Sequence, residues 1–453
     1  MPRVAKSKAN KVDGFIKEFP NEFTISYSGN LHCILCNTTV SHEKRFNVEN
    51  HRSTVGHQRK LKPQTVQATL IPEKNDFAYQ VCHAFLQADI PLWKLRSPSI
   101  SKLFSQMGHQ IPSETTCRRK VDEIANEQIS TIKKKLSGVN VFLIVDESDI
   151  DGRKFLNILI GTIQDPQSIY MGDCILLNRS PDANTVASLI DDFLKQWQIP
   201  KYKFSLLLSD AAPYMMLCAR NLKIFYQNLF HVTCISHLLH NCSLKIQAHF
   251  SDVNNLIAAV KMSIQKNLTR KQLFKEIGYP PDVALTRLGT WLNAALYYAK
   301  YFPDVKTIVN SFEDGGKIVA NAKSAVNCNT LITSLTQLVS QYKCIAENIE
   351  RCESRLFSIK HASQLISQIQ FGDDVCQIKN YIDKRWSKSE ISKVMNCENN
   401  MISPEIYSLL QNCPSTSCEV ERSFSMMKKL LAKDRNFKLE NIKNYMLVFY
   451  NKF

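Results

Sequence analysis

Three apolar runs rich in β-branched residues follow one another in the middle of the chain: VNVFLIVD at 139–146, KFLNILIGTI at 154–163 and SIYMGDCILL at 168–177. Short polar turns separate these runs, a pattern typical of consecutive antiparallel strands. The stretch at 184–199 then carries apolar residues at helical spacing, which predicts an amphipathic helix. This part of the chain therefore predicts a sheet with a helix packed on it.

The alternation of strands and helices continues beyond that helix. KFSLLLSD at 203–210 predicts a buried strand, 212–226 a helix, NLFHVTC at 228–234 another strand, and a further helix begins at Ile235. The predicted order over 139–249 is therefore β-β-β-α-β-α-β-α, the signature of a mixed fold of the α+β or α/β class.

Two aspartates end strands of this predicted sheet. Asp146 closes the first strand and Asp210 closes the fourth. In a mixed sheet of this order we expect these two strands to lie side by side and parallel, so that the carboxylates converge at one edge. Converging carboxylates repel unless a cation neutralises them, and oxygen ligands favour magnesium or manganese. A pair of such ions is a common device for phosphodiester cleavage.

An alternative interpretation of each aspartate is that it only caps the turn or helix that follows it. Asp is common at strand ends for that reason. The residues in this region leave both interpretations open.

The segment LHCILCNTTVSHEKRFNVENHRSTVGHQRK, at 31–60, carries a second set of candidate ligands. Two residues separate its cysteines, fourteen lie between the second cysteine and the first histidine of the set, and five lie between the two histidines. Zinc takes thiolate and imidazole ligands in a tetrahedron, and they occur at such spacings. We therefore predict a structural zinc site within 21–62. Its ligands are Cys33, Cys36, His51 and His57.

The regions around this segment are basic or helical. Residues 1–20 are expected to form a basic tail, and 63–75, with two prolines and little periodicity, a linker. Helical patterns over 76–138 could pair two chains or lie on DNA. Candidate DNA contacts in these regions are Arg52, Arg59, Lys60, Arg118, Arg119 and Lys120.

The second half of the chain is predicted to be helical. Residues 250–405 carry an apolar stripe that repeats every three or four residues from Leu331 onward, which favours the core of a helical bundle. Residues 406–453 add further helical patterns and contain the run SCEVERSFS at 417–425.

Composition narrows the classes of protein. The chain has 453 residues and a formal charge of +16, which favours polyanionic partners, nucleic acid first and anionic membranes second. No stretch approaches the roughly 20 apolar residues that span a bilayer, and no apolar segment of a secretory signal follows the basic N-terminus. Fifteen scattered cysteines indicate free thiols in a reducing compartment. No glycine-rich phosphate loop is present.

Three features together resemble the hAT superfamily of DNA transposases, over about 139–453. They are the two strand-ending aspartates, the run Cys234-Ile-Ser-His237, and the pattern S-x-x-x-E-R-x-F-S that begins at Ser417. The resemblance implies an RNase H-like core that an all-helical insertion domain, 250–405, interrupts before 406–453 completes the core.

The same resemblance implies a site and an activity. Asp146, Asp210 and Glu421 would form a catalytic triad that holds magnesium or manganese for DNA strand cleavage and transfer, and His237 would lie near it and contact DNA. The family usually has Arg-Trp where this chain has Arg287-Leu288. That Trp is thought to stack on a flipped base, a role that Trp291, one helical turn on, could take.

The N-terminal part resembles a BED-type finger and, over 21–136, the CGG-triplet-repeat-binding protein. The shared features are the Cys/His spacing, an equivalent of the stretch Ala88–Leu92, and an arginine pair like Arg118-Arg119. This resemblance implies binding to double-stranded DNA, a nuclear location and a homo-oligomer. Neither a membrane nor a small-molecule substrate is expected as a partner.

Two functions from different classes therefore stay open, with a third, neutral alternative. The first is a transposase, which the presence of all three acids favours. The second is a domesticated, non-catalytic nuclear DNA-binding protein that regulates transcription or chromatin, which the missing Trp at Leu288 favours. The third is a decaying element with no selected function.

Overall fold

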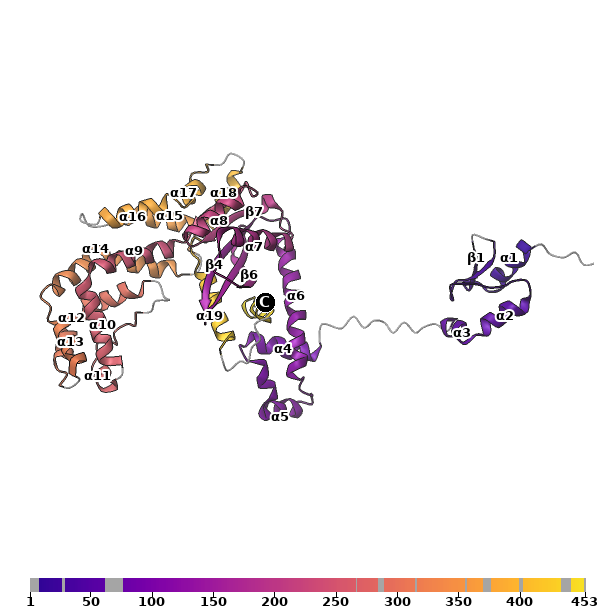
Figure 1. The fold of residues 1–453 in the computed structure, drawn as a ribbon, viewed down its shortest axis with the longest axis horizontal. Helices are drawn as coiled ribbons and strands as arrows, with labels where there is room; N and C mark the ends of the chain where they lie inside the picture. Colours follow the sequence, from indigo (N-terminus) through magenta and orange to yellow (C-terminus); the bar gives the residue numbers. More distant parts are fainter. Residues whose placement is uncertain are drawn as a thin grey trace, which may run out of the picture. The chain divides into compact units, whose positions relative to one another are not determined.

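The chain divides into two compact units, Met1–Phe77 and Ala78–Phe453, whose ribbons are drawn in Figure 1. The predicted linker at 63–75 lies outside the residues that the structure describes. The computed structural model describes residues 8–26, 29–61, 76–265, 267–283, 289–313, 316–354, 357–369, 376–398, 402–432 and 441–451.

A small antiparallel sheet and three helices make up the first unit. Its elements are α1 (Lys8–Glu18), β1 (Phe23–Ile25), β2 (Leu31–Cys33), β3 (Thr38–Thr39), α2 (Arg45–Ser53) and α3 (Val55–Leu61). Val12 of α1 is buried in one core with Phe23, Leu31 and Val48. Residues 1–20 were expected to form a tail, but Lys8–Glu18 is a helix. The reason is that this stretch can bury its apolar face only as a helix packed on that core.

The second unit contains a five-stranded mixed sheet in the strand order β6-β5-β4-β7-β8. Strands β4 and β7 pair in parallel, as do β7 and β8, and the other pairs are antiparallel. The predicted mixture of α and β structure is thereby confirmed, together with the parallel pairing of its first and fourth strands. The elements of this region are β4 (Val141–Ile150), β5 (Arg153–Thr162), β6 (Asp165–Leu177), α7 (Ala183–Gln196), η2 (Lys201–Lys203), β7 (Phe204–Ser209), α8 (Pro213–Lys223), β8 (Phe230–Thr233) and α9 (Ile235–His249).

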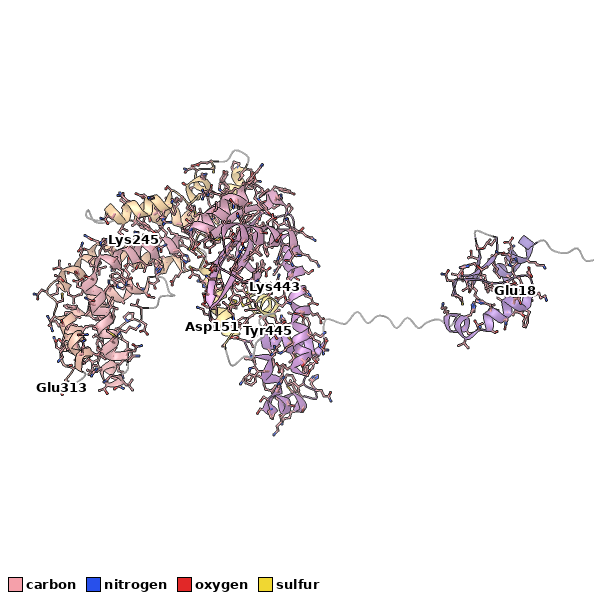
Figure 2. All side chains as sticks on the ribbon, viewed as in Figure 1. Glu18, Asp151, Lys245, Glu313, Lys443 and Tyr445 are labelled. Carbon is pink, nitrogen blue, oxygen red and sulfur yellow. The ribbon has the colours of Figure 1, made fainter. Side chains whose placement is uncertain are left out.

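The sequence predicted that the first strand ends at Asp146, but β4 continues beyond this residue. Its pairing with β7 stops at Ile144, but its pairing with β5 continues to Ile150. Asp151 and Gly152 close this hairpin with positive φ angles of 54° and 75°, the conformation of a tight two-residue turn; Figure 2 labels Asp151 at its tip. Asp146 therefore lies within the strand, just beyond the last residue paired with β7.

Helices cover both faces of the sheet. Helices α6 (Glu114–Leu136), α7 and α8 share one core cluster with β4 residues such as Leu143 and Val145, whereas α19 (Cys418–Leu430) contacts β4 and β5, and α20 (Ile442–Tyr450) contacts β6. Successive side chains of a strand point to opposite faces. Asp146 is therefore on the face opposite Val145, which is the face that α19 covers.

Every element that the structure describes between 250 and 405 is helical, as predicted. The apolar stripe is buried along α14, from Leu331 through Leu338 and Ile345 to Cys352. Figure 1 shows α9 leading from the sheet to this group of helices. The helices are α10 (Ser251–Gln265), α11 (Leu268–Gln272), α12 (Thr290–Asn310), α13 (Gly316–Val326), α14 (Leu331–Cys352), α15 (Ile359–Gln368), α16 (Cys376–Trp386), α17 (Ile391–Met395) and α18 (Pro404–Gln411).

The helices before the sheet belong to the second unit and do not form a separate region at 76–138. Gln128 of α6 donates to the Asn451 carbonyl (3.0 Å), and Asn444 of α20 donates to Asp122 (2.7 Å). No described helix has the length and apolarity needed to cross a membrane. The remaining elements are α4 (Phe77–Gln87), η1 (Leu92–Arg96), α5 (Pro98–Gln106), α6 (Glu114–Leu136), α19 (Cys418–Leu430) and α20 (Ile442–Tyr450).

A buried histidine on β8 makes the second unit sensitive to acid. Burial, together with the nearby charge of Lys223, lowers the pKa of His231 to about 4 from 6.5, and its Nε2 lies 2.9 Å from Ser209 Oγ. Because the unfolded chain takes up the proton first, neutral His231 contributes its full stability above pH 6.5 and loses it as pH falls towards 4.

We expect His231→Gln to remove this part of the pH dependence. Between pH 7 and pH 5 the wild type should lose about 2 kcal/mol more stability than the variant, measured as urea midpoints of unfolding. The exposed His249 supplies the control, since His249→Gln should behave as the wild type does. Equal pH dependence in all three proteins would contradict the assignment.

Candidate functional site

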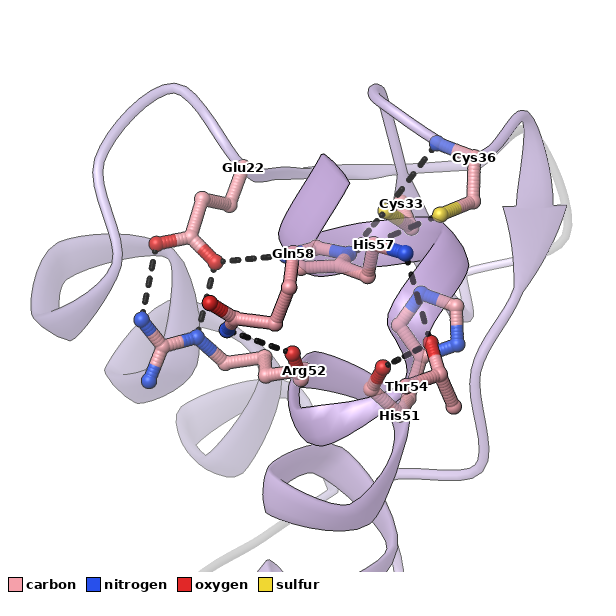
Figure 3. A network of polar contacts seen from close by, with 8 residues as sticks. All are labelled: Glu22, Cys33, Cys36, His51, Arg52, Thr54, His57 and Gln58. Atoms are coloured by element: carbon pink, nitrogen blue, oxygen red, sulfur yellow. Dashed lines mark hydrogen bonds and ion pairs between the residues drawn. The ribbon is translucent and has the colours of Figure 1, made fainter. Parts of the chain in front are cut away.

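The four predicted zinc ligands come together in the first unit. One ligand atom from each of Cys33, Cys36, His51 and His57 lies within 4.8 Å of all the others. The Nδ1 atom of His57 is 3.4 Å from Cys33 Sγ and 3.5 Å from Cys36 Sγ. Figure 3 shows both thiols facing the two imidazoles.

Local structure presents these ligands without help from the rest of the chain. Cys33 ends β2, and the tight turn after it lets the Cys36 N–H donate to Cys33 Sγ at 3.3 Å. Helix α2 carries His51 and α3 carries His57. Thr54, between the two helices, donates from its hydroxyl to the His51 carbonyl (2.7 Å). The change of direction at Thr54 brings the second imidazole back towards the first.

The donor set fits a cation that prefers sulfur and nitrogen. The Nε2 atom of His51 is buried and has no hydrogen-bond partner among the described residues. Burial raises the pKa of Cys33 and lowers the pKa of His51, so it favours the neutral form of both groups. Two sulfur and two imidazole nitrogen donors are compatible with zinc.

Glu22 is a further member of this site that no spacing pattern in the sequence indicated. His57 donates from Nε2 to Glu22 Oε2 at 2.9 Å, which leaves the Nδ1 lone pair free to face the thiols. The Arg52 guanidinium, and then His57, lower the pKa of Glu22. A carboxylate on the outer nitrogen of a ligand histidine fixes the tautomer and the ring orientation and raises the basicity of the ligand.

We expect Glu22→Ala to weaken zinc binding by about 10- to 100-fold, measured by competition with a chromophoric chelator. Glu18→Ala is the matched control, because Glu18 pairs with Arg45 on the surface of the same unit and contacts none of the four ligands. Equal zinc affinity of the two variants would show that Glu22 does not position His57.

The predicted DNA contacts near this site are only partly available. Arg52 forms a bidentate pair with Glu22 (2.7 and 2.9 Å) and lies 3.7 Å over the Phe19 ring, so it supports Glu22, and its side chain is only partly exposed. Lys60 is exposed, whereas the side chain of Arg59, on α3, lies outside the described residues.

Two members of the basic cluster on α6 also have partners within the second unit. Arg118 pairs with Glu114 (2.6 Å) and donates to the Tyr445 hydroxyl of α20, and Lys120 pairs with Glu123 (2.6 Å). Arg119 is exposed. Arg118 therefore joins α6 to α20 instead of facing a ligand, because its long side chain reaches across that helix contact.

The second candidate site lies where α19 crosses the sheet. Asp146 of β4, His237 of α9 and Glu421 of α19 each place a ligand atom within 4.8 Å of the others. The three residues come from distant parts of the second unit. Asp210 lies outside this group: its Oδ1 accepts from the Ala212 N–H (3.2 Å) at the start of α8. Asp210 therefore caps the start of α8, as one of the two interpretations of the sequence predicted. Asp146 and Glu421, by contrast, lie close to each other and to His237.

The two sequence motifs of this region hold each other in place. The Ser417 N–H donates to Cys234 Sγ (3.2 Å), and the Ser417 hydroxyl is within hydrogen-bond distance of His237 Nδ1 (3.2 Å) and Glu421 Oε1 (3.3 Å). Ser417 therefore aligns the start of α19 with the start of α9. The sequence motif contained this serine, but its role as a support was not predicted.

A buried polar pair anchors α19 to the sheet on the other side of the acids. Asn157, which pairs with Asp146 across β4 and β5, donates to the Ser423 hydroxyl at 2.8 Å. Arg422 donates to Glu419 (2.5 Å) and to the Glu353 carbonyl (2.6 Å). The arginine of the C-terminal motif thus ties α19 to the end of α14, and its acidic partner is Glu419 and not Glu421.

The group carries strongly perturbed charges. Burial, and then the negative charges of Asp210 and Glu421, raise the pKa of Asp146 to about 7 against the opposing effect of His237. Burial disfavours the charged form of His237, but Cys234, Asp146 and Glu421 raise its pKa to about 10. Acids that lie so close together need a positive partner, and here His237 supplies one positive charge.

An open cleft of about 880 Å³ gives solvent access to this group. Besides the three residues, Asp149, Ser425 and Lys428 line the cleft. Carboxylate oxygens beside an open space can hold hard divalent cations such as magnesium or manganese, and cationic side chains there can meet an anionic substrate.

No family model matches the chain, and no curated protein compared with it matches its sequence.

The tryptophan expected to stack on a base is not available for that role. Trp291 is 4% exposed, on the buried side of α12, and its Nε1 has no partner in the described chain. Its apolar ring is covered because α12 packs against α14 and α9. Arg287 and Leu288 lie outside the described residues.

Proposed function

We propose that the protein is a DNA-binding zinc-finger protein of the hAT transposase type, which cleaves and transfers DNA strands with an Asp-Asp-Glu metal site. The observation that carries this proposal is the convergence of Asp146, His237 and Glu421 within 4.8 Å in an open cleft. An acid pair assembled from a strand and a distant helix is an arrangement that folding alone does not require, since the acids repel.

The residues would divide the work as follows. Asp146 and Glu421 would hold magnesium or manganese, with Asp210 as the third acid once its side chain leaves Ala212. Such ions, when bound, activate water or a 3′-hydroxyl and stabilise the charge that develops on phosphate. His237, held by Ser417 and Cys234, would place a positive charge beside the phosphate oxygens.

The proposed partner is double-stranded DNA in the nucleus, bound by a homo-oligomer. The net charge of +16 supports an anionic partner. The Cys/His group, in the proposed role of a structural zinc site, would fold the first unit into a module that presents exposed residues such as Lys60 to DNA.

A second candidate function has its own support. The Asp210 carboxylate is taken by a backbone N–H, and Trp291 is buried. Both observations favour a non-catalytic nuclear DNA-binding protein that regulates transcription or chromatin and keeps the ancestral acids without cleavage.

A metal titration separates the two functions. Magnesium or manganese should raise the thermal midpoint of the wild type, by an amount that grows as RT ln(1 + [L]/Kd), and the enzyme should nick supercoiled DNA only when the metal is present. Metal binding without nicking would favour the regulator. If the metal causes neither a rise in the thermal midpoint nor nicking, the metal site itself is rejected.

DNA affinity is expected to fall steeply with salt. If the protein neutralises about six phosphates, log K should fall with log salt at a slope near −5. Fluorescence anisotropy with a labelled duplex at several salt concentrations measures this slope. A nearly flat dependence would argue against nucleic acid and for a protein partner.

A further inference from the structure

We propose that a second, basic cleft of this protein binds the sugar–phosphate backbone of DNA next to the acidic cleft. The basic cleft has a volume of about 540 Å³, and one face of α8, strand β8 and the chain around the end of α16 line it. Its cationic side chains are Arg220, Lys223, Arg385 and Lys388. This inference rests on the proposed binding of DNA, but not on cleavage.

The one acid that lines this cleft is already committed. Glu390 accepts from the His231 N–H of β8 (2.7 Å), pairs with Lys223, and pairs with Lys393 at 3.1 Å. The Glu390 N–H also donates to the His231 carbonyl (3.1 Å). Glu390 therefore closes the edge of β8 and neutralises Lys223, but it is not available to the other three cations.

Those three cations have no acidic partner in the part of the second unit that the structure describes. Arg220 and Lys388 are exposed, and the Arg385 guanidinium lies 5.6 Å over the Tyr381 ring. Lys245 of α9, labelled in Figure 2, lies 4.7 Å over the same ring and continues the positive charge beyond the cleft. Unpaired cations at a concave surface concentrate a positive potential there.

One short segment of chain links the lining of the basic cleft to the lining of the acidic cleft. Ala211 and Pro213 line the basic cleft, and they follow directly on Asp210. The next residue, Tyr214, donates from its hydroxyl to Glu147 (3.2 Å), which lines the acidic cleft. A strand held in the basic cleft would therefore pass Asp210 on its way to Asp146 and Glu421.

The shape of the charge favours an extended polyanion over a single anion. The cations come from separate elements, from the last turns of α8 to the end of α16 and the chain after it. The lining face of α8, from Pro213 to Lys223, is about 15 Å long, while a DNA strand carries a phosphate about every 3.4 Å of its axis. Met216 and Ala219 between the charges suit the apolar faces of sugars.

The test compares two triple variants of the full chain without added divalent cations. Arg220→Gln, Arg385→Gln and Lys388→Gln together should weaken binding of a mixed-sequence duplex by at least about tenfold and make the salt slope shallower by about 2.7, which is about 0.9 for each lost phosphate contact. The control carries Lys300→Gln, Lys306→Gln and Lys317→Gln, the same loss of charge on α12 and α13, away from both clefts.

Equal affinities and slopes of the two triple variants would overturn the proposal, even where the wild type nicks DNA. A weakened cleft variant in a protein whose wild type never nicks would support the basic cleft and reject the enzyme. If the cleft variant fails to fold, acetylation of the wild type decides: bound DNA should protect Lys388 but not Lys317. If DNA does not lower the acetylation of Lys388 more than that of Lys317, the proposal is overturned as well.

Discussion

Cys36→Ser and His51→Ala are each expected to unfold residues 21–62 and abolish specific DNA binding, while the second unit stays folded. A structural zinc site contributes on the order of 10 kcal/mol to a small domain, more than the whole stability of most domains of this size. The core of the first unit is small, with Val12, Phe23 and Val48 among its buried residues. Apolar burial alone should not keep it folded.

The measurement is native mass spectrometry of the full chain together with limited proteolysis. Wild type should carry one zinc ion and resist cleavage in the first unit, and both variants should lose the ion and be cut there first. Cys328→Ser is the control, because Cys328 is exposed and belongs to the second unit. A first unit that resists protease after removal of its zinc would contradict the prediction.

Asp146→Asn is expected to abolish metal-dependent nicking, by at least about a hundredfold, and to remove most of the metal-induced rise in thermal midpoint. Asp146 is the acid that faces both Glu421 and His237, so no neighbouring group replaces its charge. Without metal the variant should be at least as stable as the wild type, because Asn keeps the shape and removes a buried charge that Asp210 and Glu421 repel.

Asp151→Asn is the matched control for this prediction. It makes the same chemical change at the tip of the same hairpin, where the backbone has a positive φ that Asn tolerates. It should nick and respond to metal as the wild type does. If Asp146→Asn also retains full metal stabilisation, the acidic group is not a metal site, and α19 carries its motif only for packing.

Local patterns were enough to predict the strands of the sheet and the group of Cys and His residues that come together in the first unit. The runs at 139–146 and 203–210 are short, largely apolar and bounded by turn residues, a pattern typical of buried strands, and they form β4 and β7. The four Cys and His residues lie within one short stretch, so a turn and two helices bring them together with few long-range contacts.

Features that depend on packing between distant segments could not be predicted in this way. Lys8–Glu18 reads as a basic tail until the core that covers Val12 is present. Glu22 precedes the first strand and gives no sign of a role until α3 places His57 beside it. Trp291 was a candidate to replace the base-stacking Trp, but contacts of α12 with α14 and α9 bury it.

At the acidic site, the sequence indicates the candidate residues and the tertiary structure decides which of them come together. The sequence by itself indicated which residues could bind a metal, because local composition predicted the strands that Asp146 and Asp210 follow and the resemblance of the C-terminal motif added Glu421. Only the tertiary structure decided which of them meet. The β4–β5 hairpin places Asp146 beyond the last residue of β4 that pairs with β7. The hydrogen bond between Asn157 and Ser423 holds α19 against the sheet. The hydrogen bond from the Ala212 N–H holds the Asp210 carboxylate at the start of α8. The Asn157–Ser423 contact joins residues far apart in the sequence, and the free energy of such a contact exists only once the sheet has formed.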